Sequence, residues 1–281
     1  MNWIAEHKLD IGTRVSWFVD WLTDNASGFF DGIAWALSYL IDKLLLVLLG
    51  PPPLVVILAT VALAWLVRRN WKFPLFAAIA LLFVFNQGYW EETMETLSLV
   101  ISSSVLCMIV GIPIGILAAR SDTFYAVLRP VLDLMQTIPT FVYLIPALIL
   151  FGLGMVPGLI ATVIFAIPAP IRLTRLGISS TPKPLIEAGQ AFGATTWQLL
   201  WKIEMPYAMP SIMAGLTQTI MLSLSMVVIA ALVGADGLGV PTLRALNQVN
   251  IAKGFEVGLA IVMIAIMLDR FLKTSDGKTD R

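Results

Sequence analysis

The sequence has few charges, one cysteine and one histidine, and these shortages exclude several classes of protein. Only 13% of its 281 residues are charged, against roughly 25% in a typical soluble domain. Eighteen basic and eighteen acidic residues cancel, so no net field favours nucleic acid as a partner. The single cysteine, Cys107, cannot form a disulfide within the chain or a cysteine-based metal cluster. His7 lies in a polar N-terminal tail, which argues against a histidine-centred catalytic or metal site.

Three further features are missing. The phosphate-binding pattern Gly-x-x-x-x-Gly-Lys-Ser/Thr does not occur in the sequence, so we expect no ATP and no other cofactor in this chain itself. No paired-carboxylate, His or Cys site suggests catalysis, which disfavours a membrane-embedded enzyme. Residues 1–30 mix acidic residues with scattered aromatics and lack an unbroken apolar core, so no secretory signal peptide is expected.

Apolar residues dominate what remains. They make up 58% of the chain, and the mean hydropathy is +0.88. A helix that spans a bilayer needs about 20 mostly apolar residues. The sequence therefore predicts an all-α, polytopic transmembrane helical bundle. Seven candidate spans satisfy this pattern, at roughly 52–68, 72–89, 95–119, 126–152, 157–175, 207–234 and 254–272.

An additional stretch, 32–50, is amphipathic. An apolar stripe that includes Ile33 and Leu37 faces a stripe that includes Asp31 and Asp42. Because charges are costly at bilayer depth, we favour a helix lying in the membrane interface over a spanning helix. The sequence thus divides into an N-terminal tail with an interfacial helix over 1–50 and a transmembrane domain over 51–281, with a polar loop at about 176–206.

The basic residues indicate how the chain is oriented. If the seven spans alternate, four basic clusters fall on one side of the membrane, and that side is expected to be cytoplasmic. The N-terminus is then outside, which makes the tail periplasmic, and the C-terminus is cytoplasmic. The clusters comprise Arg68, Arg69 and Lys72; Arg120 and Arg129; Arg172, Arg175, Lys183 and Lys202; and Arg270, Lys273, Lys278 and Arg281.

The polar loop has the composition of a protein-docking element. The run 185–204 is predicted to be helical and to end at Pro206. Small residues between Ala188 and Gly193 allow another protein to approach closely, and Phe192 and two nearby tryptophans add apolar contact area. A loop helix that packs on its own bundle has a similar composition, so both interpretations remain open on these grounds.

A motif in this loop resembles the signature of ABC importer permeases. That signature is Glu-Ala-Ala, three residues, Gly, nine residues, Ile, one residue and Leu-Pro. The sequence departs from it by glycine at the third position and methionine before the proline. The residues at the signature positions are Glu187, Ala188, Gly189, Gly193, Ile203 and Pro206. The resemblance implies a type I ABC importer fold, in which this cytoplasmic helix seats in a groove of an ATPase subunit and couples it to the membrane domain.

Longer strings resemble the permeases for glycine betaine, proline betaine and choline. The strings are 133–139, 151–154, 172–174, 221–230, 237–239 and 268–270. The resemblance implies a homodimer in the bilayer of the bacterial cytoplasmic (inner) membrane, with two ATPase subunits that hold ATP and Mg and a periplasmic or extracellular substrate-binding protein. An ABC permease for another small solute, such as an amino acid, is an alternative. An ion-coupled secondary transporter is a further alternative, but the sequence shows none of the inverted repeats common in that class.

Polar groups within spans are candidates for the translocation pathway. Asp133, Gln136 and Thr137 lie in the fourth span, which Pro139 is expected to bend. The simpler interpretation of Asp133 is an ion pair with Arg129, four residues earlier.

Aromatic residues follow in the same span and the next one. Phe141, Tyr143, Phe151 and Phe165 offer π faces that suit a quaternary ammonium group. Packing against helices or lipid is the simpler interpretation of these four residues. Of the four, Phe141 and Tyr143 are kept as pathway candidates, because they lie closest in the sequence to the polar residues of the fourth span.

Overall fold

The structure, a computed structural model, describes residues 10–272, and every regular element in that range is helical. His7, Lys273, Lys278 and Arg281 lie outside the described residues. The elements are α2 (Ile11–Leu49), α3 (Pro53–Arg68), α4 (Lys72–Asn86), α5 (Trp90–Arg120), α6 (Asp122–Thr137), α7 (Thr140–Phe151), α8 (Met155–Ala166), α9 (Pro168–Ser179), α10 (Lys183–Ala191), α11 (Thr196–Leu199), the π-helix η1 (Leu200–Glu204), α12 (Met205–Ala230), the short 3₁₀-helix η2 (Ala231–Val233), α13 (Gly239–Asn247) and α14 (Ile251–Leu272).

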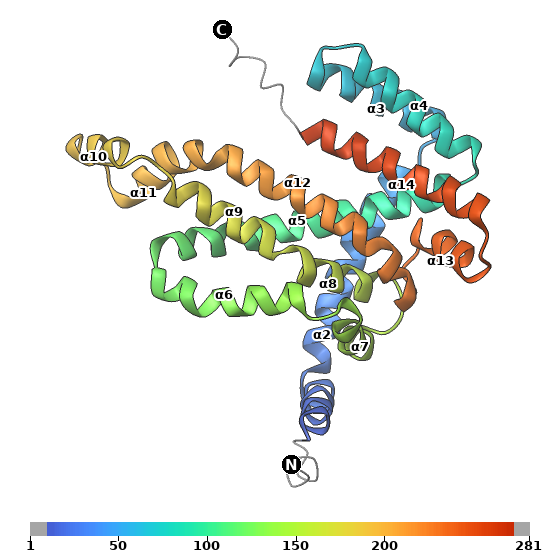
Figure 1. Ribbon diagram of the computed structural model, residues 1–281, viewed down its shortest axis with the longest axis horizontal. Coiled ribbons are helices and arrows are strands. Elements are labelled where there is room, and N and C mark those ends of the chain that lie inside the picture. The colour runs from blue at the N-terminus through green and yellow to red at the C-terminus, as the bar shows by residue number, and fades with distance from the viewer. Residues whose placement is uncertain (1–9, 273–281) are drawn as a thin grey trace.

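The centre of the molecule is a bundle in which α5, α9 and α12 lie side by side (Figure 1). Glycines allow the close approach of these helices. A Cβ atom at Gly115 would lie 2.6 Å from the Cβ of Thr174 and 2.8 Å from the carbonyl oxygen of Ile171. A Cβ at Gly177 would lie 2.9 Å from that of Ala208. Backbones this close leave no room for a side chain, as is typical of helix packing in membranes.

The hairpin α3–α4 and the last helix, α14, cover one flank of this bundle (Figure 1). A continuous apolar core joins them to α5 and α12, with residues such as Leu81, Leu99 and Ile264 fully buried. At one end of this flank the Arg68 guanidinium donates hydrogen bonds to the carbonyl oxygen of Arg270, at 3.0 Å from Nε and 2.7 Å from Nη2. The turn after α3 and the end of α14 therefore lie together.

The seven predicted spans need correction. Within residues 10–272, five helices are long and apolar enough to cross a membrane, or six if α6 and α7 count as one bent span. The first two predicted spans form the short helices α3 and α4, with 16 and 15 residues. At 1.5 Å per residue each is about 24 Å long, less than the roughly 30 Å hydrocarbon core. The predicted span 72–89 ends early because the chain turns at Gln87 and at Gly88, whose φ is +77°.

Span four is bent, as predicted. The axes of α6 and α7 differ by 94°. Ile138 and Pro139 between them have extended ψ angles of 130° and 131°, which end one helix and begin the next. Proline favours this break because it has no backbone N–H to continue the hydrogen-bond ladder of α6.

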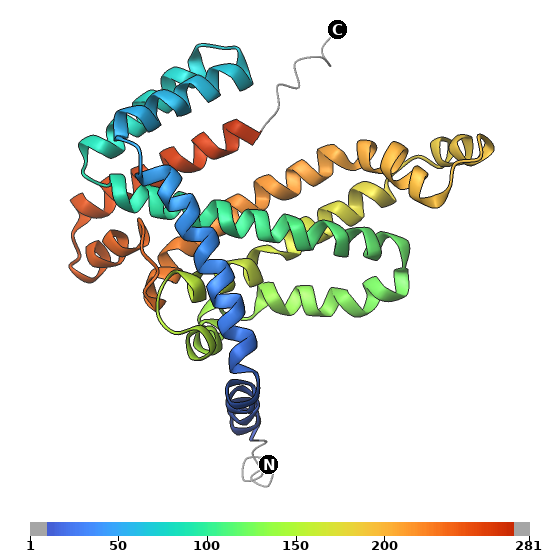
Figure 2. The same ribbon diagram turned by 180° about the vertical axis from the view of Figure 1, so that it is seen from behind.

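Helix α2 is longer than predicted. It begins at Ile11, not near residue 32, and continues to Leu49, with a kink at Ala26, where φ is −126° and ψ is 17°. Residues 12–49 form one of the five helices counted above as long and apolar enough to cross a membrane. Figures 1 and 2 show α2 running across the bundle axis, not along it. It contacts α5, α7 and α8. Its placement in the membrane interface stays a prediction.

Candidate coupling arm and translocation path

Residues 183–204, which we call the arm, project from one end of the bundle between α9 and α12 (Figure 1). The arm is not the single helix predicted over 185–204. It contains α10, a break at residues 192–195, the single turn α11 and the π-helix η1. The prediction that Pro206 ends the helix is also wrong, because η1 continues into α12 and Pro206 occupies its first turn. Proline is tolerated there since its missing N–H has no required partner.

The break after α10 is a Schellman motif centred on Gly193. The N–H of Gly193 donates to the carbonyl oxygen of Gln190 at 2.9 Å, and that of Ala194 donates to Gly189 at 3.0 Å. Gly193 has φ of +77°, the left-handed conformation that glycine adopts without steric cost. Thr195 then begins α11 with a capping box, in which its hydroxyl and backbone N–H exchange hydrogen bonds with Gln198.

Gly189 holds the two parts of the arm together. It is the buried residue of α10, and a Cβ there would lie 2.5 Å from Cδ1 of Ile203 and 2.6 Å from Cδ2 of Leu199. The absence of a side chain therefore lets α10 pack directly on α11 and η1. Of the signature residues, Gly189 and the half-buried Ile203 form this internal contact, whereas Glu187 and Ala188 are exposed.

The arm exposes several large apolar side chains that no other part of residues 10–272 covers. Phe192 is 93% exposed, and Trp197, Trp201 and Leu185 are also exposed. The two tryptophan rings meet edge to face, with centroids 5.6 Å apart. Large exposed aromatics on one short projecting element are typical of a protein-interaction site. The arrangement favours docking to a partner over packing on the bundle, the alternative that the sequence left open.

At the root of the arm, a buried carboxylate binds an arginine from another helix. Glu204 is 3% exposed, and both its carboxylate oxygens accept hydrogen bonds from Arg120 at the end of α5. Neighbouring Arg175, on α9, donates to the carboxylate of Asp122 at 3.2 Å and stacks on the Tyr125 ring, 3.6 Å from its centroid. These contacts place the ends of α5, α6, α9 and α12 together.

The predicted pathway residues Asp133 and Gln136 share a partner on α9. Arg172 donates to the carboxylate of Asp133 at 2.6 Å and to the amide oxygen of Gln136 at 3.3 Å. The predicted Arg129–Asp133 pair is also present, but at 3.9 Å it is the longer of the two. Asp133 thus links α6 to α9, a contact that a local spacing argument on α6 alone missed.

The remaining pathway candidates do not join this cluster. Thr137 is the last residue of α6, whereas Phe141 and Tyr143 lie on α7 beyond the bend. Phe141 is exposed, whereas Tyr143 and Phe165 each pack against a buried cluster that includes Met226. The four aromatics therefore do not form a cage: the ring of Phe151 instead meets that of Phe30 from α2, with centroids 5.5 Å apart.

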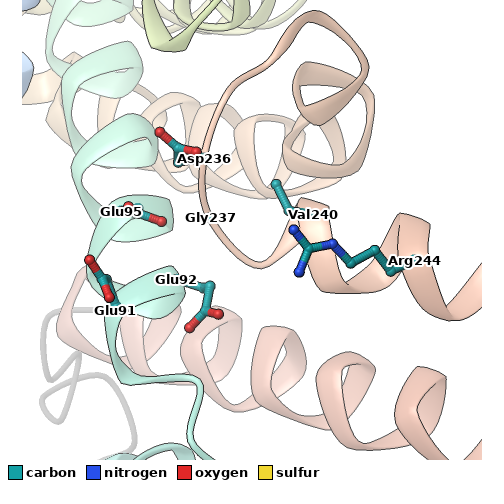
Figure 3. A pocket seen from close by; sticks show the side chains of 7 residues that line it. All are labelled: Glu91, Glu92, Glu95, Asp236, Gly237, Val240 and Arg244. Carbon is teal, nitrogen blue, oxygen red and sulfur yellow. The ribbon is translucent and has the colours of Figure 1, made fainter.

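The opposite end of the bundle carries an acidic cavity of about 190 Å³ that was not predicted. Figure 3 shows the glutamates of α5 facing the loop that contains Asp236, with Arg244 reaching toward them from α13. The hydroxyl of Thr96 fixes this loop, since it accepts from the N–H of Leu238 at 2.8 Å. The cavity is lined by Glu91, Glu92, Glu95, Asp236, Gly237, Val240 and Arg244.

The sequence of this chain is similar to those of curated permeases. Residues 111–279 match the family described as binding-protein-dependent transport system inner membrane component. The chain is 45% identical to the glycine betaine transport system permease protein OpuAB of Bacillus subtilis, over 94% of this chain and 93% of that protein. It is 43% identical to the glycine betaine/carnitine transport permease protein GbuB of Listeria monocytogenes, over 99% and 95%. It is 41% identical to the glycine betaine/proline betaine transport system permease protein ProW of Escherichia coli, over 90% and 71%.

The fold is similar to that of a solved ABC importer. An inward-facing structure of the MetNI methionine ABC transporter superimposes with a TM-score of 0.58 over 66% of this chain and 92% of that chain, at 22% identity. This likeness confirms the expected type I ABC importer fold. The helical bundle and the arm between α9 and α12 agree with this fold. The match over residues 111–279 shows that the chain belongs to the family of binding-protein-dependent transport system inner membrane components.

Proposed function

We propose that this chain is the membrane-spanning permease subunit of an ATP-driven importer for quaternary ammonium osmolytes, with glycine betaine as the first candidate solute. The observation that carries the proposal is the projecting arm, which keeps the signature spacing from Glu187 to Pro206 and exposes Phe192 and two tryptophans to a partner. Because the sequence has no phosphate-binding loop, ATP and Mg belong on a separate ATPase subunit that receives this arm.

The relatives support the class of solute. Proteins 41–45% identical to this chain are named for glycine betaine, carnitine and proline betaine, which share a quaternary ammonium group. Choline shares it too and remains a candidate. In an importer that works with an external binding protein, selectivity can reside in that protein. The scattered positions of Phe141, Tyr143, Phe151 and Phe165 are therefore compatible with transport of such solutes.

A second copy of the chain is the proposed partner within the bilayer. Gln218 lies midway along α12 and is exposed in the single chain, with Ala214 and Ser225 exposed on the same face. An amide side chain facing lipid at that depth is unfavourable, so such residues usually face another helix or water. We infer that this face of α12 lies at a homodimer interface that encloses the path. Gln218 was not among the predicted pathway residues.

The arm end of the bundle is proposed to be cytoplasmic. Arg68 lies beside Arg270, and Arg120 and Arg175 lie at the root of the arm, so the basic clusters gather toward one end. Glu91, Glu92 and Asp236 gather at the other. This asymmetry supports a bacterial inner-membrane protein with a cytoplasmic C-terminus and with its N-terminal segment outside. There α2 would lie along the interface and the external binding protein would dock.

Uptake by the complete importer tests the proposal. Cells that express the permease with its own ATPase and binding protein should accumulate labelled glycine betaine, while a variant ATPase that cannot hydrolyse ATP should abolish uptake. Competition by choline, proline betaine and methionine ranks the solutes. Uptake that persists without ATP hydrolysis would establish a secondary transporter instead. Uptake of methionine alone would establish an amino-acid permease.

A further inference from the structure

The arm is connected to the bundle in more than one way. It continues covalently into α9 at one end and into α12 at the other. A third connection runs to α5, through the side chains of Arg120 and Glu204, which are 84 residues apart in the sequence. This third connection is noncovalent, so substitution can remove it without altering the path of the chain.

The geometry of this contact is that of a fixed link. Arg120 donates from Nη1 to Oε1 of Glu204 at 3.1 Å, and from Nη2 to Oε2. A two-pronged bond of this kind fixes both the distance and the orientation of the two groups. The Glu204 side chain is 4% exposed and that of Arg120 37% exposed. Around it Leu200 and Met205 pack against the last turns of α5, including Ile112 and Ile116.

The backbone at Glu204 is unusual in the same place. Residues Leu200–Glu204 form a π-helix, and the N–H of Met205 donates to the carbonyl oxygen of Leu200, five residues earlier. Short π-helical segments are rare, hold one extra residue in a turn and are often found at functional sites. Because such a turn can tighten to an α-helical one, it is a suitable place for the arm to move relative to α12.

We propose that the Arg120–Glu204 pair makes α5 follow the arm, so that displacement of the arm by the ATPase moves α5 together with α9 and α12. The proposal rests on the permease function proposed above. Without the pair, the π-helix absorbs part of the displacement and α5 lags behind. Arg120 and Glu204 are then positioning residues for the coupling of ATP hydrolysis to transport, and neither needs to contact the solute.

A nearby ion pair supplies a matched control. Arg175 and Asp122 lie at the same end of the bundle and join α9 to α6, but the Asp122 side chain is 97% exposed and neither residue lies on the arm. Removing that carboxylate charge should therefore leave coupling unchanged. Glu204→Gln retains the shape of the buried side chain but not its charge. Because Arg120 is partly exposed, this variant leaves no fully buried cation.

The first measurement is the number of ATP molecules hydrolysed per labelled glycine betaine transported, by the complete importer in liposomes. Glu204→Gln should raise this ratio by at least about threefold, within the range of coupling energies between contacting residues. Asp122→Asn should leave it unchanged, and the exchange of Arg120→Glu with Glu204→Arg should restore it in part. If the pair were only structural, Glu204→Gln would lower the amount of assembled importer but leave the number of ATP molecules hydrolysed per glycine betaine unchanged. That result would overturn the proposal.

The second measurement does not depend on transport. Spin labels at Leu117 on α5 and Leu185 on α10, both exposed, report the distance between α5 and the arm in a Cys107→Ala background. Glu204→Gln should broaden this distance distribution, whereas Asp122→Asn should not. An unchanged distribution would refute the link even if transport proceeds. A broadened distribution in a protein that fails to transport glycine betaine would refute only the proposed function.

Discussion

Substitutions at Gly193 can test the backbone conformation of the arm separately from the side chains on its surface. The residue has φ of +77° at the end of α10, and a Cβ there would meet nothing within 4 Å. Within this chain, a substitution at Gly193 therefore acts through the backbone alone. The left-handed conformation costs an ordinary residue about 1–2 kcal/mol, and Asn and Asp tolerate it better than others.

These values predict an order of effects. Gly193→Ala should destabilise the Schellman motif by about 1 kcal/mol, which shifts the balance between the formed and frayed end of α10 about fivefold. Gly193→Asn should have a smaller effect, and Gly193→Val a larger one because β-branched residues rarely adopt positive φ. We therefore expect ATPase binding and glycine betaine uptake to fall in the order wild type, Asn, Ala, Val.

Gly193→Asp adds a test of the surface. Asp and Asn have nearly the same shape and backbone preference, so any difference between them reports the charge alone. If the ATPase covers this position, the Asp variant should bind it markedly less than the Asn variant, because a buried carboxylate without a partner is unfavourable. Co-purification of the ATPase and the initial uptake rate, each normalised to permease in the membrane, measure both effects. Equal activity of the Val and wild-type proteins would refute the backbone argument, and equal activity of Asp and Asn would refute docking at Gly193.

Three further predictions follow from neighbouring contacts. Phe192→Ser should weaken ATPase binding at least about tenfold while membrane insertion stays normal, because an aromatic anchor at the centre of an interface contributes about 2 kcal/mol or more; pull-down of the ATPase with permease in the membrane measures this. Gly189→Ala should be tolerated, since the atoms it meets are the movable ends of Ile203 and Leu199, whereas Gly189→Leu should separate the two parts of the arm and abolish uptake in the transport assay. Gly115→Ala should lower thermal stability in detergent, because it meets the backbone of α9, while Gly258→Ala in α14, where a Cβ meets nothing within 4 Å, should leave stability unchanged or raise it; an unfolding temperature that falls equally in both would contradict the packing argument.

The arm shows how far local sequence signals extend. The spacing from Glu187 to Pro206 identified the family because its residues lie close together in the chain. The break inside the arm also had local signals, a glycine after a helical run and Thr195 followed by Gln198 three residues later. These signals outweigh helix propensity here. The prediction of one unbroken helix is therefore wrong at residues 192–195, where the glycine and the capping box end one helix and begin the next.

The translocation path could not be predicted in the same way. Asp133 had a plausible partner four residues away, yet its closer partner, Arg172, comes from a helix 39 residues later. The Arg120–Glu204 pair spans 84 residues. Nothing in the local pattern distinguishes these charges from ordinary loop residues, because their partners are set by how helices pack. Pro139 was informative, since a proline constrains the backbone wherever it is.

These contacts together argue for a single moving unit. Gly115 fits against Thr174, and Gly177 against Ala208, so α5, α9 and α12 pack with their backbones close together. Densely packed interiors transmit displacement with little compression. A displacement of the arm by the proposed ATPase subunit should therefore rotate the three helices as one body, provided that Glu204 holds α5 at the root of the arm. The bend at Pro139 separates α7 from this body. Two glycines with positive φ, Gly152 and Gly154, connect α7 to α8. We therefore expect the largest change in shape at the junction of α6 and α7, beside the cluster of Asp133, Gln136 and Arg172.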